Sequence, residues 1–238
     1  NVVKKVGSIG LAGAMVFGVP AAMAVDFTGS VEVQNNIAVE NVADLSFGNL
    51  SIAAAAGDGA DTAAEFAAFQ LAADGGVTLA TSDNTAVQFV DLGGATPAEA
   101  RVVTGSDFTL KFPANSWVTE LDDISGGVDS GAGSDAVAVH AAVTADEGIR
   151  LENALGDPSF ADFFLFNLTV GEVATVGNAF GDPTATQSTP ETDWSFTAPA
   201  NATEYTFAIG GTLVTDPLGA LPYEELLYEG TFEVTANF

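Results

Sequence analysis

The chain contains no cysteine, one histidine and only five lysine and arginine residues among 238. The lack of cysteine excludes disulfides, a thiol nucleophile and cysteine-ligated metal. A single histidine, His140, leaves no histidine cluster for zinc and no second histidine for a proton relay. His140 falls in an alternating apolar run over residues 137–143, so we expect it on the solvent face of a strand.

The amino-terminal segment has the pattern of a secretory signal peptide. Two lysines precede an uncharged apolar run over residues 6–19, and an Ala-Met-Ala triplet at residues 22–24 places small residues at the −3 and −1 positions of a cleavage site. The run is shorter than the roughly 20 residues of a membrane-spanning helix, which argues against an uncleaved anchor. We expect residues 1–24 to be removed on export and residues 25–238 to form the secreted protein.

Basic residues are scarce in the exported part of the chain. Removal of the two amino-terminal lysines leaves three basic residues against 32 acidic ones, a net charge near −29. Such a surface repels nucleic acid and anionic lipid headgroups, so we expect neither as a partner. It also repels copies of itself unless salt screens the charge, which is typical of a marine or halophilic setting. An acidic surface protein of a freshwater organism is the alternative.

Most of the chain reads as short strands separated by Gly, Asp, Asn and Pro turns, the pattern of a β-sandwich or barrel. Gly48 marks a change of phase within one strand segment and predicts a bulge or kink there. The expected strands are residues 31–34, 37–42, 45–52, 77–79, 87–89, 100–104, 108–112, 137–143, 163–170, 194–197, 205–209 and the terminal segment from residue 228.

One segment has a helical pattern. Residues 62–65 read as a capping box, and Phe66 and Phe69 would share one face of a helix of about three turns that ends before a Gly-Gly pair. Residues 122–135 and 181–193 are rich in Gly, Ser, Thr and Asp and predict exposed loops.

The last residues alternate with the period of a half-buried strand, and Phe232, Val234, Ala236 and Phe238 are expected to face inward. This strand closes either a soluble β-sandwich or an outer-membrane barrel. Outer-membrane barrels carry aromatic girdles rich in Tyr and Trp. The chain has only three Tyr and two Trp, so its composition favours the sandwich.

Three motifs occur in a particular order. They are LSFG at residues 45–48, VTG at residues 103–105 before a strand that ends at Pro113, and YEGTFEVTANF at residues 228–238. Their order resembles the bacterial secreted DUF4402 domain family, which is similar to subunits of chaperone–usher pili and to spore-coat-U-like proteins. The resemblance implies an immunoglobulin-like sandwich and a surface or fibre subunit. Residues 124–199 match the family poorly.

Acidic side chains offer two chemical hypotheses. The carboxylate pairs at residues 122–123 and 224–225 could serve a glycosidase, but adjacent pairs arise by chance among 32 acidic residues. Asp122, Asp123, Asp129, Ser130 and Asp135 lie in one Gly-rich loop and could supply oxygen ligands to calcium. No EF-hand pattern supports this site, and a solvated acidic loop is the alternative reading.

Each of two apolar segments could belong to the core of the domain or form a contact with another subunit. The block at residues 163–166 is either a strand buried on both faces or a subunit contact. Val31, Val33, Ile37 and Val39 form either the first strand of the sandwich or a donor strand that completes a neighbouring subunit.

These patterns predict an all-β fold: an immunoglobulin-like or pilin-like antiparallel β-sandwich with one short helical insertion. We expect one domain over residues 25–238 with a loop-rich insertion around 122–199. The expected role is that of a secreted, non-enzymatic cell-surface or fimbrial-type structural or adhesive subunit that assembles by β-strand donation. Export would pass through the periplasm of a Gram-negative bacterium.

The partners expected of such a subunit are copies of itself, other surface subunits and a periplasmic chaperone. We expect no catalytic, cofactor-binding or metal-binding residues, no cofactor and no small-molecule substrate. The alternatives are an outer-membrane β-barrel and a secreted carbohydrate-binding or hydrolytic module.

Overall fold

The structure of the protein is a computed structural model that describes part of the chain. Predictions for the signal peptide, the strand at residues 31–34, the capping box at residues 62–65 and residues 123, 129 and 130 of the acidic loop lie outside that part. The described residues are 37–54, 66–81, 87–104, 106–122, 124–125, 135–172, 184–188, 190–197, 204–217 and 221–238.

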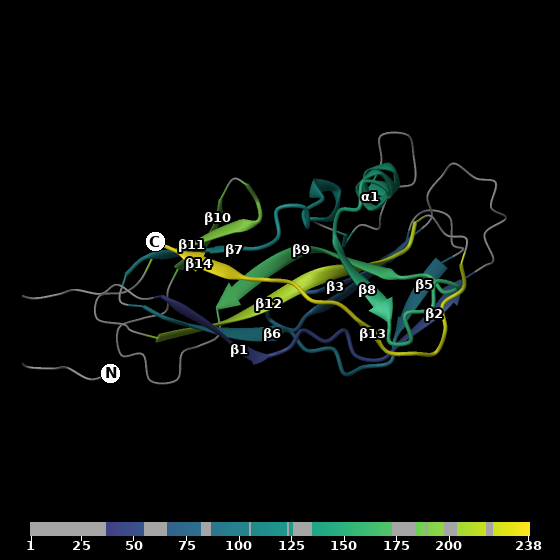
Figure 1. Ribbon diagram of the computed structural model, residues 1–238, viewed down its shortest axis with the longest axis horizontal. Coiled ribbons are helices and arrows are strands. Elements are labelled where there is room, and N and C mark those ends of the chain that lie inside the picture. Colours follow the sequence, from purple (N-terminus) through teal and green to yellow (C-terminus); the bar gives the residue numbers. More distant parts are fainter. Residues whose placement is uncertain are drawn as a thin grey trace, which may run out of the picture. The chain divides into compact units, whose positions relative to one another are not determined.

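The main sheet has eight strands and curls into a half-barrel (Figure 1). Its long central strand, β12, pairs with β9 on one side, and its other side is shared by β6 along the first half and β3 along the second half. Every strand pair in the described residues is antiparallel. In order across the sheet the strands are β1 (Ala38–Ala43), β6 (Ala98–Val103), β12 (Glu204–Thr215), β9 (Phe163–Glu172), β8 (Ile149–Asn153) and β13 (Tyr228–Glu229), with β3 (Ala67–Leu71) and β4 (Val77–Thr81) branching from β12.

Two smaller sheets pack against the main sheet through a cluster of aromatic and aliphatic side chains. Within this cluster Phe108 stacks on Phe196 with ring centroids 4.7 Å apart, and Phe69 meets Phe47 and Phe89 edge to face. One small sheet has the order β10 (Thr184–Ser188), β11 (Asp193–Thr197), β7 (Phe108–Lys111) and β14 (Thr235–Asn237), and the other pairs β2 (Leu50–Ala54) with β5 (Val87–Asp91).

A second apolar cluster covers the other face of the main sheet. The helix α1 (Asp135–Thr144) and the 3₁₀ turn η1 (Thr119–Leu121) pack with apolar side chains of β3, β9 and β12, including Phe164, Phe166 and Val214. The centre of the main sheet is therefore buried on both faces. This explains why residues 163–168 of β9 and the second half of β12 are buried continuously instead of in alternation.

A predicted helix and a predicted strand are wrong, and the same two-sided burial explains the first of these errors. The expected helix around Phe66 and Phe69 is the strand β3, in which neighbouring residues are buried on opposite faces, so the sequence shows no period of two. The expected strand at residues 137–143 is α1. Its buried residues Val139, Ala142 and Val143 follow helical spacing, whereas Val137 is 46% exposed.

Other expected strands are confirmed with shifted ends. They are those that correspond to β1, β2, β4, β5, β6, β7, β9, β11 and β12. Gly48 has φ +70°, which agrees with the predicted kink. The loop prediction at residues 181–193 is wrong for Thr184–Ser188, which form β10. The terminal strand spans only Thr235–Asn237, and Phe238 is 57% exposed instead of facing inward.

Candidate functional site

The residues singled out for acid–base or metal chemistry do not form a catalytic group in the described part of the chain. His140 lies half-buried on α1, and Glu224 and Glu225 are exposed in the segment before β13. Among the described residues no group of three or more His, Asp or Glu side chains could hold a metal ion.

Asp122 belongs to a structural clamp centred on Asn167, a residue that sequence reasoning missed. Asn167 is 2% exposed, has φ +48° and donates from its backbone N–H to the Ser116 carbonyl. Its side chain accepts a hydrogen bond from Val118 N and donates to Val118 O, both at 2.8 Å, and donates to Asp122 Oδ1 at 3.0 Å. Burial, followed by the charges of Glu191 and Glu120, raises the pKa of Asp122.

The basic residues of the described chain are all held in ion pairs. Each has at least one carboxylate within 4 Å, so none of the three stands apart as a binding group for an anionic ligand. The pairs join Arg101 to Glu40 and Glu204, Lys111 to Asp193, and Arg150 to Asp146 and Asp162.

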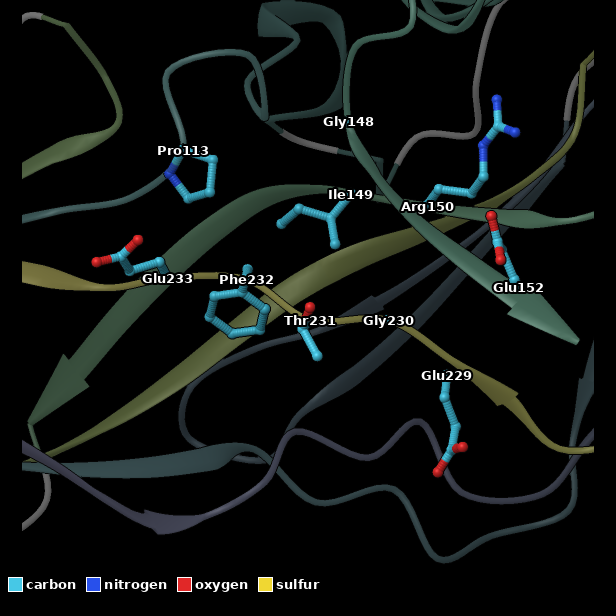
Figure 2. Close-up of a pocket in the computed structure, with 10 residues that line it drawn as sticks. All are labelled: Pro113, Gly148, Ile149, Arg150, Glu152, Glu229, Gly230, Thr231, Phe232 and Glu233. Carbon is cyan, nitrogen blue, oxygen red and sulfur yellow. The ribbon is translucent and has the colours of Figure 1, made fainter. Parts of the chain in front are cut away.

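An open groove of about 580 Å³ lies where the terminal segment passes from β13 toward β14 (Figure 2). Ile149, Pro113 and Phe232 supply apolar surface, and the backbone of Gly230 is so close to β8 that a Cβ would overlap the Arg150 carbonyl oxygen. The segment therefore lies flat against β8 before it joins the other sheet.

The groove is acidic. Glu152 and Glu229 are register partners across β8 and β13, and Glu233 lies on the same lining. Figure 2 shows the Arg150 side chain pointing away from Glu229 and Glu233. Its guanidinium instead lies 5.6 Å from the centre of the Phe164 ring and pairs with carboxylates outside the groove. Like charges opposite one another destabilise strand pairing, so we expect salt to stabilise this part of the sheet.

The terminal strand β14 forms an open edge, which is the more informative feature. Among the described residues β14 pairs with β7 alone and ends its sheet. The strand β1 ends the main sheet, and its Cα atoms come within 8 Å of those of β14 without any pairing between them. Half-buried apolar side chains of both strands and of the residues just before each strand pack on the main core: Ile37, Val39, Phe232, Val234 and Ala236.

Two tyrosines fix the chain that leads to this edge. The Tyr228 hydroxyl accepts from Glu224 N at 3.1 Å and donates to Glu224 O at 3.4 Å. The Tyr223 hydroxyl accepts from Asp216 N at 2.6 Å, and burial raises its pKa well above the ordinary tyrosine value. Both rings lie 4.7 Å from the Phe163 ring. Tyr228 falls in the closing motif, which was the only sequence signal for this role.

Comparison with protein-family models, curated proteins and solved structures gave no match. No helix in the described part of the chain is both long and apolar enough to cross a membrane.

Proposed function

We propose that the protein is a secreted, non-enzymatic surface or fimbrial-type structural subunit with an immunoglobulin-like or pilin-like sandwich, and that it assembles by β-strand donation. The observation that carries this proposal is the open edge of β14 beside β1. The resemblance to the DUF4402 family, given by the ordered motifs, supports the same reading.

The strand order supports the immunoglobulin-like part of the proposal. In that fold strands A, B, E and D form one sheet, and C, F and G form the other. Taken in chain order, β1-β6-β12-β9 have the order A-B-E-D, and the neighbours β7 and β14 correspond to C and F. No described strand occupies the G position beside β14. The remaining strands and α1 are then additions to this core.

A tyrosine bonded to backbone groups a few residues upstream is a further feature of immunoglobulin-like sandwiches, where it stands near the start of strand F. Tyr228, which bonds to Glu224 and precedes β14, has this arrangement. Its position supports the assignment of the terminal segment to strand F.

The donor is expected to be the segment before β1. Residues 38–43 pair with β6, and Glu40 on β1 binds Arg101 on β6, so donation by this part would break the pairing of β1 with β6. Residues 25–36 remain available in sequence, and Phe27, Val31 and Val33 alternate there with polar residues. Such a strand would add backbone hydrogen bonds to β14 and cover the half-buried apolar side chains beside it.

A matched pair of substitutions tests the proposal. Val33→Asp places a carboxylate on the apolar side of the expected donor strand, and Gln34→Asp places the same charge on the polar side. In molar salt, negative-stain microscopy and size-exclusion chromatography should show fibres or oligomers for the mature protein and for Gln34→Asp, and folded monomers for Val33→Asp. Equal assembly by both variants, or monomers throughout, would overturn the proposal.

A further inference from the structure

The outward face of the small sheet β10-β11-β7-β14 carries a line of uncharged polar side chains, one from each strand. Thr186 pairs in register with Ser195, Ser195 with Thr109, and Thr109 with Asn237. Thr186, Ser195 and Asn237 are exposed, and Thr109 is half-exposed. Neighbouring residues in these strands, such as Leu110 and Phe196, face the core, which fixes the line on the outside.

A second line runs parallel to the first, two residues along each strand. It consists of Ser188, Asp193, Lys111 and Thr235, again in register. Lys111 Nζ and Asp193 Oδ2 lie 3.0 Å apart, so the two charges of this line neutralise each other. The eight residues of the two lines, here called the hydroxyl face, therefore carry no net charge.

The hydroxyl face has no net charge, although the chain is strongly acidic. The secreted part has a net charge near −29, and Asp107 and Glu233 stand at the two ends of the hydroxyl face along β7 and the terminal segment. An anionic polymer or a second copy of the chain would meet strong repulsion on approach. An uncharged polymer meets none, and the hydroxyl and amide groups of the face both donate and accept hydrogen bonds.

We infer that the hydroxyl face binds an uncharged, extended, β-linked polysaccharide. Strands lie about 4.8 Å apart and next-nearest residues about 7 Å apart along a strand, so the polar groups form a regular grid. The spacing between strands is close to the length of one sugar residue in an extended β-1,4-linked glycan. A glycan chain laid across the four strands would therefore meet one polar side chain per sugar.

Binding at a single face is expected to be weak. A single hydrogen bond adds little net affinity in water, and the face has no exposed aromatic ring among its eight residues. Repetition of the face along a fibre would raise the avidity without any new contact. In that sense the inference rests on the proposed function, because the fibre supplies the repetition in the cell.

Coupling the protein to beads presents many copies of the hydroxyl face without any need for fibres. The mature Val33→Asp chain, which is expected to stay monomeric, is coupled densely to beads, and the beads are mixed with microcrystalline cellulose, chitin and an alginate gel. Retention on cellulose or chitin is expected to exceed retention on alginate at least tenfold and to persist in molar NaCl. Every variant on the face also carries Val33→Asp, so none of them is expected to form fibres. A failure of glycan binding can then be distinguished from a failure of fibre assembly.

Substitutions on the face and away from it separate specific binding from adsorption. Ser195→Glu puts a bulky charge in the centre of the hydroxyl face and should abolish retention, whereas Ser195→Thr keeps the hydroxyl and should retain binding. Ser51→Glu makes the same charge change on an exposed position of β2 and should have no effect. Circular dichroism checks that each variant is folded. Absence of retention by the parent beads, or equal retention by Ser195→Glu, would overturn the inference.

Discussion

Replacement of Asn167 by alanine should be among the most destabilising changes in the chain. The side chain makes 2.8 Å hydrogen bonds to the N–H and the C=O of Val118, which is 7% exposed, and the C=O also accepts from Leu121 N at 3.0 Å. Only the Val118 N–H would therefore lose its partner, which costs roughly 1–3 kcal/mol for a buried donor. Alanine at φ +48° adds about 1–2 kcal/mol, since only Gly, Asn and Asp adopt this region readily. We expect a loss of roughly 2–5 kcal/mol.

Urea unfolding in molar NaCl, followed by circular dichroism, measures this loss. Asn167→Gly loses the same hydrogen bonds but tolerates the backbone angle, so it should be less destabilised than Asn167→Ala by about 1–2 kcal/mol. Asn237→Ala, at an exposed position, should stay within about 0.5 kcal/mol of the parent. A change below about 0.5 kcal/mol for Asn167→Ala would refute the clamp, and equal losses for alanine and glycine would refute the contribution of the backbone angle.

Three further changes test other parts of the account. Phe232→Ala should cost roughly 1.5–3 kcal/mol, less than for a fully buried ring, whereas Phe238→Ala, at a ring 57% exposed, should stay within about 0.5 kcal/mol in the same urea assay. The raised pKa of Tyr223 contributes stability that is complete below pH 10 and is lost as the pH rises through the folded-state pKa. Tyr223→Phe should therefore lose less Tm above pH 10 than the parent protein does. An unchanged dependence of Tm on alkaline pH would count against this role of Tyr223. The Tm of the mature protein should rise from low to molar NaCl, and a flat or falling Tm would contradict the repulsion expected from a charge near −29.

Sequence patterns predicted strands that have one buried face and one face toward solvent. The strands β6 and β7 alternate strictly, and both were found. Prediction was wrong where a second apolar layer removes that alternation. In β3, Ala67 and Ala68 are both 0% exposed because one faces the main cluster and the other faces the layer under α1. Nothing in the local sequence reports that second layer.

The helix α1 was predicted as a strand because its sequence suggests an alternation that its burial does not follow. Val137 and Val139 suggest alternation, yet only Val139 is buried. Alanine-rich segments with several valines fit both periods, and packing against η1 and the main sheet decides between them. The strand β8 was missed although Ile149 to Glu152 alternate between apolar and charged residues, the pattern of a half-buried strand. It pairs with the next strand, β9, and with β13 of the terminal segment, which is distant in sequence.

The open edge could be predicted only in part. The closing motif indicated a terminal strand, but its partner and its free side depend on β7 and β1, which lie far away along the chain. The clamp at Asn167 had no sequence signal, since a lone Asn between apolar residues gives no indication of a positive φ.

The most direct measurement of strand donation is hydrogen exchange along β14. The mature protein is assembled in molar salt, and deuterium uptake by residues 230–238 is compared with that of the Val33→Asp variant by mass spectrometry. The account predicts that these residues exchange slowly in the assembled protein and quickly in Val33→Asp, while β7 and β12 are protected in both. Equal exchange of residues 230–238 in the two proteins, with the parent assembled, would contradict donation to this edge.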